Sequence, residues 1–233
     1  MKENNIKTIS INNKYYPENL KKIYDPPKVI YVKGNYKILN NLSISIVGCR
    51  DATDYGKKAA KYFSYWLSKN KINIVSGLAK GIDSFAHIGA VCGKVEENSK
   101  NVDNLSTFGT IAVVGTGLDI VYPKENKYLE EKIIETGGAI ISEYPLGTKP
   151  TRYNFPKRNR IISALSKGVL VIEAKEKSGT LITVDFALEQ GRDVFVVPGN
   201  INSLNSVGTN HLIKQGAIIV TNYKEILDIY NIK

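Results

Sequence analysis

Residues 44–77 read ISIVGCRDATDYGKKAAKYFSYWLSKNKINIVSG, and this stretch decides the fold. Residues 44–47 and 72–75 are two short β-rich runs on either side of a helical pattern. The apolar residues of that pattern share one face of a helix, and they are Ala59, Ala60, Phe63, Trp66 and Leu67. A strand, a helix and a second strand in this order predict a unit with two parallel strands.

The same alternation continues towards the C-terminus. Further β-rich runs occupy residues 110–114, 139–142, 168–172, 194–197 and 217–220. Most of the runs are continuously apolar, which is typical of strands buried on both faces of a parallel sheet. Glycines follow helical patterns at residues 125–136 and 187–190, where helix C-caps belong. We therefore predict an α/β fold with a doubly wound, mostly parallel sheet.

Residues 1–40 differ in composition from the rest of the chain. They contain eight lysines against three acidic residues, together with several prolines and a short apolar run at residues 29–32. We predict that residues 1–40 form a small N-terminal extension that packs on a main domain made of residues 41–233. Residues 93–109 are polar, and we predict a flexible surface loop there.

The composition favours an acidic partner. The chain has 233 residues, 42% of them hydrophobic, and a formal net charge of +10. This charge favours nucleic acid first and an anionic membrane surface second, with general solubility of a Lys-rich chain as the alternative. No apolar run approaches the roughly 20 residues of a membrane span, and no signal peptide is evident, so we expect a cytoplasmic protein. Cys49 and Cys92 lie outside metal-ligand spacing, and we expect neither a metal nor a cofactor.

Three glycine-containing turns precede helices and suit an anion. Backbone N–H groups approach an anion closely at such a turn, and the helix N-terminus adds a favourable dipole. The guanidinium of Arg50 would add a positive charge that can donate two hydrogen bonds to one phosphate. The alternative at each turn is an ordinary tight turn or helix cap. The candidate residues are Gly48, Cys49, Arg50, Gly115, Gly117, Lys177, Ser178, Gly179 and Thr180.

Residues 151–160 read TRYNFPKRNR and contain no acidic residue. Four cations (Arg152, Lys157, Arg158 and Arg160) alternate here with two aromatic residues, Tyr153 and Phe155. This mixture suits a single nucleic-acid strand, because cations bind phosphates and rings stack on unpaired bases. Arg158 and Arg160 cannot share one helical face, so we expect one to point inward. The alternative is a solvated helix start. Together with the three turns, this stretch predicts an extended cationic groove at the carboxyl ends of the strands.

Two nucleotide-binding enzyme classes lack their motifs. The strict GxGxxG pattern is missing, residues 75–77 offer no acid for a ribose hydroxyl, and no GxxxxGK[ST] occurs. No spacing supports Glu143, Glu173 or Asp185 as a catalytic carboxylate, so we expect a protein that is not an enzyme. The alternative is a Rossmann-like nucleotide (phosphoribo)hydrolase, in which Asp185 would follow the turn at residues 177–180.

Seven segments of the chain follow a known family pattern in register. They are VGCR (47–50), SGLAKGIDSFAH (76–87), TIAVVGTGLDIVYPKEN (110–126), SEYPLGTKP (142–150), FPKRNRIISALSKGVLVIEAKEKSGTLIT (155–183), ALEQGRDVFVVPGNI (187–201) and GTNHLIKQGA (208–217). Together they closely resemble the DNA-processing protein A family (DprA, also called Smf). The lead-in YPENLKKIYDPPKVIYVKGN (16–35) also resembles that family, and the resemblance covers about residues 15–227.

The resemblance implies an extended Rossmann-like fold and a single-stranded DNA-binding protein without a known catalytic reaction. It further implies a homodimer that helps load the RecA recombinase onto incoming DNA during natural transformation. Arg50 would bind phosphate in the family's glycine turn, where Cys49 replaces the usual serine and offers a poorer hydrogen-bonding group. The DNA contacts implied for the FPxRNR segment are Phe155, Lys157, Arg158, Asn159 and Arg160.

Overall fold

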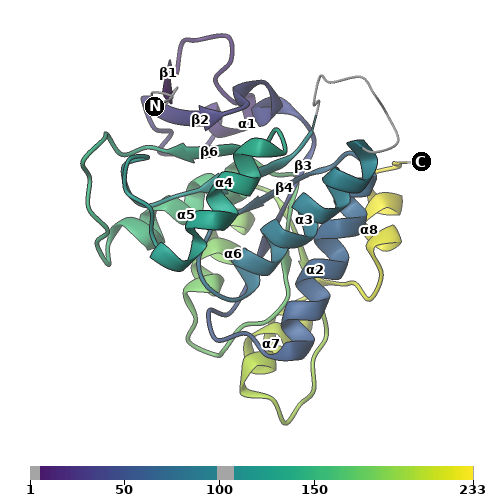
Figure 1. Ribbon diagram of the computed structural model, residues 1–233. Coiled ribbons are helices and arrows are strands. Elements are labelled where there is room, and N and C mark those ends of the chain that lie inside the picture. Colours follow the sequence, from purple (N-terminus) through teal and green to yellow (C-terminus); the bar gives the residue numbers. More distant parts are fainter. Residues whose placement is uncertain (1–5, 99–107, 233) are drawn as a thin grey trace.

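One mixed sheet forms the centre of the molecule. In the computed structural model, which describes residues 6–98 and 108–232, nine strands form this sheet in the order β1-β2-β6-β5-β4-β3-β7-β8-β9 (Figure 1). The strands are β1 (Ile6–Ser10), β2 (Val29–Gly34), β3 (Ser43–Val47), β4 (Asn73–Ser76), β5 (Thr110–Val113), β6 (Ala139–Ser142), β7 (Gly168–Val171), β8 (Asp193–Val196) and β9 (Ile218–Ile219). In the sheet order from β6 to β9, every neighbouring pair of strands is parallel. The two remaining pairs, β1 with β2 and β2 with β6, are antiparallel. The predicted mostly parallel α/β sheet is confirmed.

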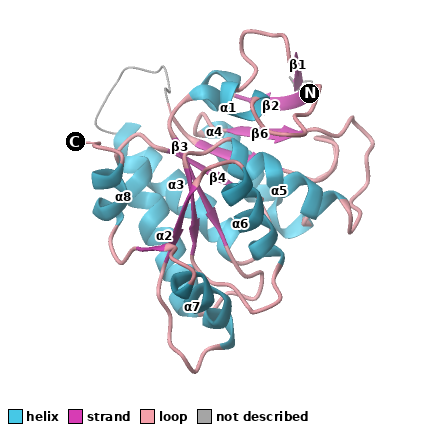
Figure 2. Cartoon of the chain, turned by 180° about the vertical axis from the view of Figure 1, so that it is seen from behind, coloured by secondary structure: helices cyan, strands magenta, loops and turns pink. Residues whose placement is uncertain are grey.

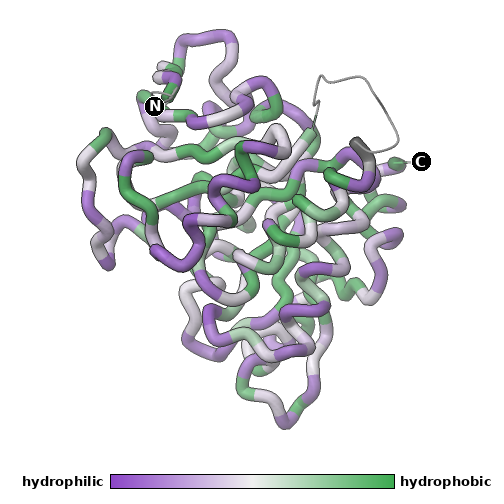
Figure 3. The backbone as a smooth tube through the Cα atoms, in the orientation of Figure 1, coloured by the Kyte–Doolittle hydropathy of each residue, from purple (hydrophilic) through white to green (hydrophobic). Residues whose placement is uncertain are grey.

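Helices cover both faces of this sheet (Figures 1 and 2). They are α1 (Glu18–Lys21), α2 (Asp54–Lys69), α3 (Ile82–Asn98), α4 (Lys127–Glu135), α5 (Asn154–Ala164), α6 (Gly179–Glu189), α7 (Val207–Lys214) and α8 (Tyr223–Ile229), with 3₁₀ turns η1 (Tyr36–Asn40), η2 (Lys124–Asn126) and η3 (Leu204–Ser206). In β3, Ile46 belongs to the core shared with α2 and α3, and Val47 to the core shared with α5 and α6. Burial on both faces explains why the central strands are largely apolar. In Figure 3 much of the hydrophobic colouring lies in the middle of the molecule.

The chain changes its direction of travel across the sheet at β3. From β3 it proceeds through β4, β5 and β6 on one side, and β7 then pairs with the other side of β3. The loops that follow β3 and β7 therefore diverge at their carboxyl ends. Such a switch point is where open α/β sheets bind their ligands.

The N-terminal segment adds two antiparallel strands to the same sheet. β2 pairs with β6, and β1 forms the outer edge. The sequence did not identify β1 as a strand, because only Ile9 of its five residues is buried and the hydrophobic signal is correspondingly weak. Tyr16 and Leu20 bury their side chains in the core beside α5. The domain boundary at residue 40 stays a prediction.

Helix α3 is longer than the sequence indicated. It continues to Asn98, so the predicted loop over residues 93–109 is wrong for its first residues. Gly93 packs closely on α2, because a Cβ there would lie 2.6 Å from the carbonyl oxygen of Tyr65. This packing continues the contact between α2 and α3 beyond the apolar part of the α3 sequence. Of the rest of that predicted loop, residues 99–107 lie outside the described residues, and Phe108 and Gly109 are buried, so the prediction of a surface loop is wrong there too. Within the described ranges, no helix has both the length and the apolar character needed to span a membrane.

Candidate nucleic-acid interface

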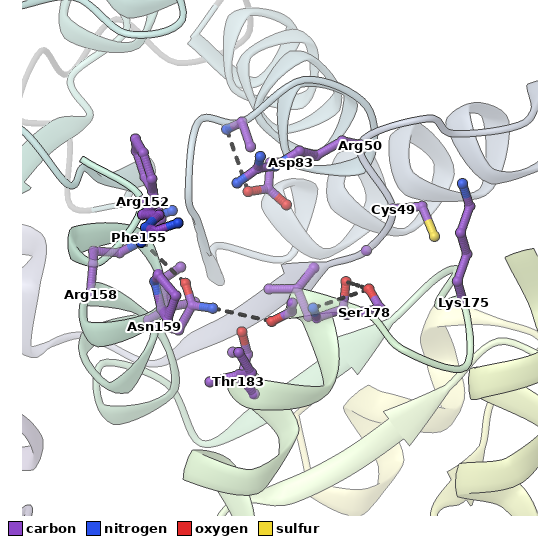
Figure 4. Close-up of a pocket in the computed structure, with 18 of the residues that line it drawn as sticks. Cys49, Arg50, Asp83, Arg152, Phe155, Arg158, Asn159, Lys175, Ser178 and Thr183 are labelled. Atoms are coloured by element: carbon purple, nitrogen blue, oxygen red, sulfur yellow. Dashed lines mark hydrogen bonds between the residues drawn. The ribbon is translucent and has the colours of Figure 1, made fainter. Parts of the chain in front are cut away.

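A cavity of about 640 Å³ opens at the switch point of the sheet. Its walls come from the loop after β3, the turn after β4, the N-terminal half of α5 and the loop from β7 into α6. Figure 4 shows α5 side chains on one side and the residues after β3 on the other. Five cationic side chains line the cavity (Arg50, Arg152, Arg158, Lys175 and Lys177) against two carboxylates, Asp51 and Asp83. The cavity therefore favours an anion.

The turn after β3 is held tightly by its neighbours. The backbone N–H of Cys49 donates to the carbonyl oxygen of Glu173 (2.9 Å), and its carbonyl accepts from the N–H of Ile82 (3.1 Å). A Cβ on Gly48 would lie 2.6 Å from Cγ1 of Ile82, so the turn requires glycine here. The Cys49 thiol is buried, and burial raises its pKa. Arg50 is exposed at the mouth of the cavity.

An aromatic ring lies beside the Arg50 guanidinium. Its Cζ lies 5.8 Å from the ring centroid of Phe155, at the start of α5. Phe155 in turn stacks on Tyr122, with centroids 5.3 Å apart and an angle of 29° between the rings. Nearby, the Arg152 guanidinium lies 4.9 Å from the ring centroid of Tyr153 and donates to its hydroxyl (2.7 Å). Cations and ring faces thus lie next to one another at the cavity, an arrangement that suits unpaired nucleotides.

Arg158 lies at the floor of the cavity and is only 4% exposed. Its Nη1 donates to the carbonyl oxygen of Gly77, at 2.8 Å, and to that of Val113. Burial lowers the pKa of Arg158 to about 10, and the nearby Asp83 opposes this shift. The guanidinium connects α5 to the carboxyl ends of β4 and β5. Arg158 therefore has a structural role, whether or not it also contacts a ligand.

Asp83 and His87 lie in the first turns of α3 and are both buried. Oδ2 of Asp83 accepts from the N–H groups of Gly77 (3.2 Å) and Ala79 (3.4 Å). Burial raises the pKa of Asp83, although Arg158 and these N–H groups oppose the shift. Nδ1 of His87 lies 2.7 Å from Oγ1 of Thr110. Both side chains therefore complete the turn and the helix packing.

The loop into α6 supplies the opposite wall. Ser178 caps α6 by accepting from the N–H of Thr180 (3.2 Å). Lys177 and Gly179 are exposed, and the carbonyl oxygen of Gly179 accepts from Nδ2 of Asn159 on α5 (3.3 Å). This hydrogen bond connects the α5 and α6 walls, and the structure thus brings four predicted residues of this loop to the cavity: Lys177, Ser178, Gly179 and Thr180.

Four predicted site residues lie outside the cavity lining. Lys157 is exposed on α5, whereas Arg160 is buried and donates both Nη groups to Glu143. Gly115 and Gly117 are buried behind the wall. The carbonyl oxygen of Gly115 accepts from Nδ2 of Asn154 (3.0 Å), and the N–H of Gly117 donates to Thr148 (3.0 Å). The DNA contacts of these four residues, like those of the predicted residues in the lining, stay predictions.

Tyr122 and Lys175 are among the lining residues that did not emerge as site candidates from the sequence. Tyr122 comes from the loop after β5, and Lys175 comes from the loop after β7, where its Nζ lies 3.4 Å from a carboxylate oxygen of Asp51. Both follow the carboxyl end of a parallel strand, and that position was the available signal.

The acidic residues considered for catalysis are engaged elsewhere. Glu173 accepts from the N–H of Thr53 at the start of α2, and Glu143 pairs with Arg160. Asp185 is exposed on α6 and does not line the cavity. Across residues 6–98 and 108–232, no group of three His, Cys, Asp or Glu side chains is arranged to hold a metal ion.

The fold and the cavity define a class: a Rossmann-like α/β protein with a cationic, aromatic-lined site at the switch point of its sheet. Residues 7–231 match the family model of the DNA recombination-mediator protein A, and the chain belongs to this family. The resemblance found in the sequence is thereby confirmed.

Three curated relatives show how much of a longer protein the chain covers. It is 43% identical to Protein Smf of Escherichia coli, over 94% of this chain and 55% of that protein. It is 43% identical to the DNA processing protein DprA of Streptococcus pneumoniae (94% and 73%) and 41% identical to that of Bacillus subtilis (97% and 72%). The chain thus spans about half the length of the E. coli protein.

Two solved structures share the fold. The X-ray structure of DprA from Streptococcus pneumoniae has a TM-score of 0.85 and 41% identity, covering 96% of this chain and 74% of that one. DNA processing protein A from Helicobacter pylori, solved to describe its single-stranded DNA binding mode, has a TM-score of 0.82 and 30% identity, covering 98% and 96%. The chain therefore belongs to a DNA-processing and recombination-mediator family with the Rossmann-like fold predicted from the sequence.

Proposed function

We propose that this protein binds single-stranded DNA in the cavity between α5, α6 and the turn after β3. The observation that carries the proposal is the joint placement of Arg50, Phe155 and Arg152 at the mouth of one cavity at the switch point of the sheet. Guanidinium groups bind phosphates, and ring faces stack on unpaired bases, which a duplex keeps covered. The family membership and the single-stranded DNA binding of the H. pylori relative support the same reading.

The proposed DNA-contacting set follows the cavity and its rim. Arg50 and Lys177 bind phosphates, the turn at Gly48 and Cys49 positions Arg50, and Phe155 and Asn159 meet the nucleotide from α5. Lys157 extends the cationic rim along the exposed side of α5.

We further propose the family's cellular role for this chain. In this role a cytoplasmic homodimer helps load the RecA recombinase onto incoming DNA during natural transformation. The support is the family match over residues 7–231. Recombination mediation needs no turnover, so the protein would act by binding and not as an enzyme.

The test of DNA binding is a salt series with a labelled poly-dT oligonucleotide. Wild type is compared with Arg50→Ala/Lys157→Ala, and duplex DNA serves as the ligand control. About three to five phosphate contacts give a log–log slope of roughly −2 to −3.5 on a single strand. Lys58→Ala/Lys61→Ala removes the same charge from exposed positions of α2 outside the cavity and is the matched control.

The proposal expects the slope of the Arg50→Ala/Lys157→Ala variant to fall by about one to two units while the control keeps its slope. Duplex DNA should bind much more weakly than poly-dT. If poly-dT fails to bind wild type, or binds with a slope that both double variants leave unchanged, the proposal is wrong. A screen of nucleotides for hydrolysis would then be the next experiment.

A further inference from the structure

Tyr122 places an exposed aromatic ring at the mouth of the cavity. It follows β5 in the chain and lines the cavity. The side chain of Tyr122 is 45% exposed, although its ring is large and mostly apolar. Phe155 stacks on the ring, with 5.3 Å between the two centroids.

The stack on Phe155 orients the Tyr122 ring. An angle of 29° between the two planes is close to parallel, so the pair extends one aromatic surface outward from the cavity. Phe155 is fixed at the start of α5, and Arg50 lies over its ring. The inner ring is therefore held from two sides, while Tyr122 keeps exposed ring surface.

The cations nearby are placed for phosphates rather than for bases. Arg50, from the loop after β3, lies over the Phe155 ring, and Arg152, just before α5, also lines the cavity. A strand whose phosphates meet these guanidinium groups would turn its bases toward the adjacent ring faces. In a duplex the bases are stacked on their neighbours and their faces are not available.

We propose that Tyr122 is a nucleobase-stacking residue that gives the cavity its preference for unpaired bases. The inference rests on the proposed single-stranded DNA binding and assigns a specific task to a residue within it. Stacking on a ring face is tolerant of sequence, because every base has a π-face. Tyr122 thus selects unpaired bases of any sequence, and the guanidinium groups supply the salt-dependent part of the affinity.

The alternative is that Tyr122 only supports Phe155. Two oligonucleotides separate the two roles: poly-dT, and an abasic phosphodiester strand of equal length. A stacking residue acts on bases alone, so Tyr122→Ala should weaken poly-dT binding and leave abasic-strand binding unchanged. A residue that only holds the wall in place would lower the affinity for both strands.

The expected loss for Tyr122→Ala on poly-dT is roughly 5- to 30-fold, in the lower part of the range for removal of one stacking ring. Tyr122→Phe keeps the ring and should restore the affinity. Tyr24→Ala is the matched control, because Tyr24 is fully exposed and lies outside the cavity. An unchanged affinity in Tyr122→Ala, or an equal loss on both strands, overturns the assignment.

A fluorescence measurement gives a second readout. Trp66 is the single tryptophan of the chain, so Tyr122→Trp in a Trp66→Phe background carries one indole, at the cavity. Poly-dT should quench that indole, and the abasic strand should leave it unchanged. If poly-dT binds with the predicted salt slope but does not quench it, stacking is wrong while DNA binding stands. If wild type binds no single strand at all, both proposals fail.

Discussion

Arg160 and Glu143 form a bidentate ion pair in the interior of the protein. The Nη1–Oε1 and Nη2–Oε2 distances are both 2.7 Å, and the side chains are 7% and 9% exposed. Nε of Arg160 also donates to the carbonyl oxygen of Asp25 in the N-terminal segment (3.1 Å). The pair therefore joins three parts of the chain: the end of β6, the segment between α1 and β2, and helix α5, which carries one wall of the cavity.

The first prediction concerns this ion pair. Glu143→Gln removes the counter-charge and leaves the Arg160 guanidinium buried, so we expect the free energy of unfolding to fall by about 3 kcal/mol. Urea denaturation measures the loss. Asp25→Asn is the control, because its carboxylate is 61% exposed and 3.4 Å from Nε; it should cost less than about 1 kcal/mol. Equal losses in the two variants would mean that the buried pair contributes no more to the free energy of unfolding than the exposed Asp25 carboxylate.

The second prediction separates Arg158 from Arg50. Arg158→Met leaves the carbonyl groups of Gly77 and Val113 without their donor, and should lower the free energy of unfolding by about 2–3 kcal/mol. Arg50 is exposed, so Arg50→Ala should leave stability nearly unchanged and reduce the salt slope of poly-dT binding by about 0.7 per phosphate contact. A stable Arg158→Met variant that loses slope would instead make Arg158 a phosphate ligand.

The parallel part of the fold was readable from the sequence because its strands are buried on both faces. Each residue of β3, β4, β5, β6 and β7 is buried, so the strands appear as apolar runs with little ambiguity. The edge strand β1 buries only Ile9 and gains its backbone partners from β2, a contact distant in the chain that no local pattern reveals. The polar end of α3 was missed for a similar reason, because packing on α2 and not hydrophobic periodicity extends it.

The position of the site was predictable, and its exact lining was not. Parallel topology gathers the loops after β3, β5 and β7 at one edge, which placed Arg50 and the residues 177–180 correctly at the cavity. On α5, the lining residues Phe155, Arg158 and Asn159 are three or four positions apart and share one helical side. Lys157 lies between them in the sequence, and the helical repeat turns its side chain away from the cavity. The composition of the segment does not show which of its residues share a helical face. Tyr122 was missed because its neighbour Phe155 lies 33 residues away.

The third prediction concerns pH. Burial, with Arg158 nearby, lowers the pKa of His87 to about 3, whereas an unfolded histidine has a pKa of about 6.5. Between these values the unfolded chain binds a proton that the folded protein does not, so stability falls as pH falls. The contribution of His87 approaches about 1.4 kcal/mol per pH unit.

His87→Gln isolates this contribution. The difference in the free energy of unfolding between wild type and variant should shift in favour of the variant as pH falls from about 7 to about 4. Asp83 has a pKa raised by burial and therefore contributes the opposite slope, but it is present in both proteins and cancels in the comparison. Parallel stability curves for the two proteins would show that folding does not lower the pKa of His87.

The last prediction compares two glycines that the sequence placed at anion-binding turns. A Cβ on Gly48 would lie 2.6 Å from Cγ1 of Ile82 and 3.0 Å from the carbonyl oxygen of Glu173, whereas no heavy atom lies within 4 Å of a Cβ on Gly179. Gly48→Ala should therefore destabilise the protein by about 1–3 kcal/mol through overpacking. Gly179→Ala lies at the start of α6, where alanine should be tolerated or stabilise the fold by up to about 1 kcal/mol.

Poly-dT binding by these two variants distinguishes packing from ligand contact. If a phosphate approaches the backbone at Gly179, the added methyl group should weaken binding in a protein whose thermal stability is intact. Gly48→Ala should lose stability and affinity together, because the same displacement moves Arg50. A Gly179→Ala variant that binds as tightly as wild type would limit the role of that turn to capping by Ser178, and the anion contacts of this wall would then come from the side chain of Lys177.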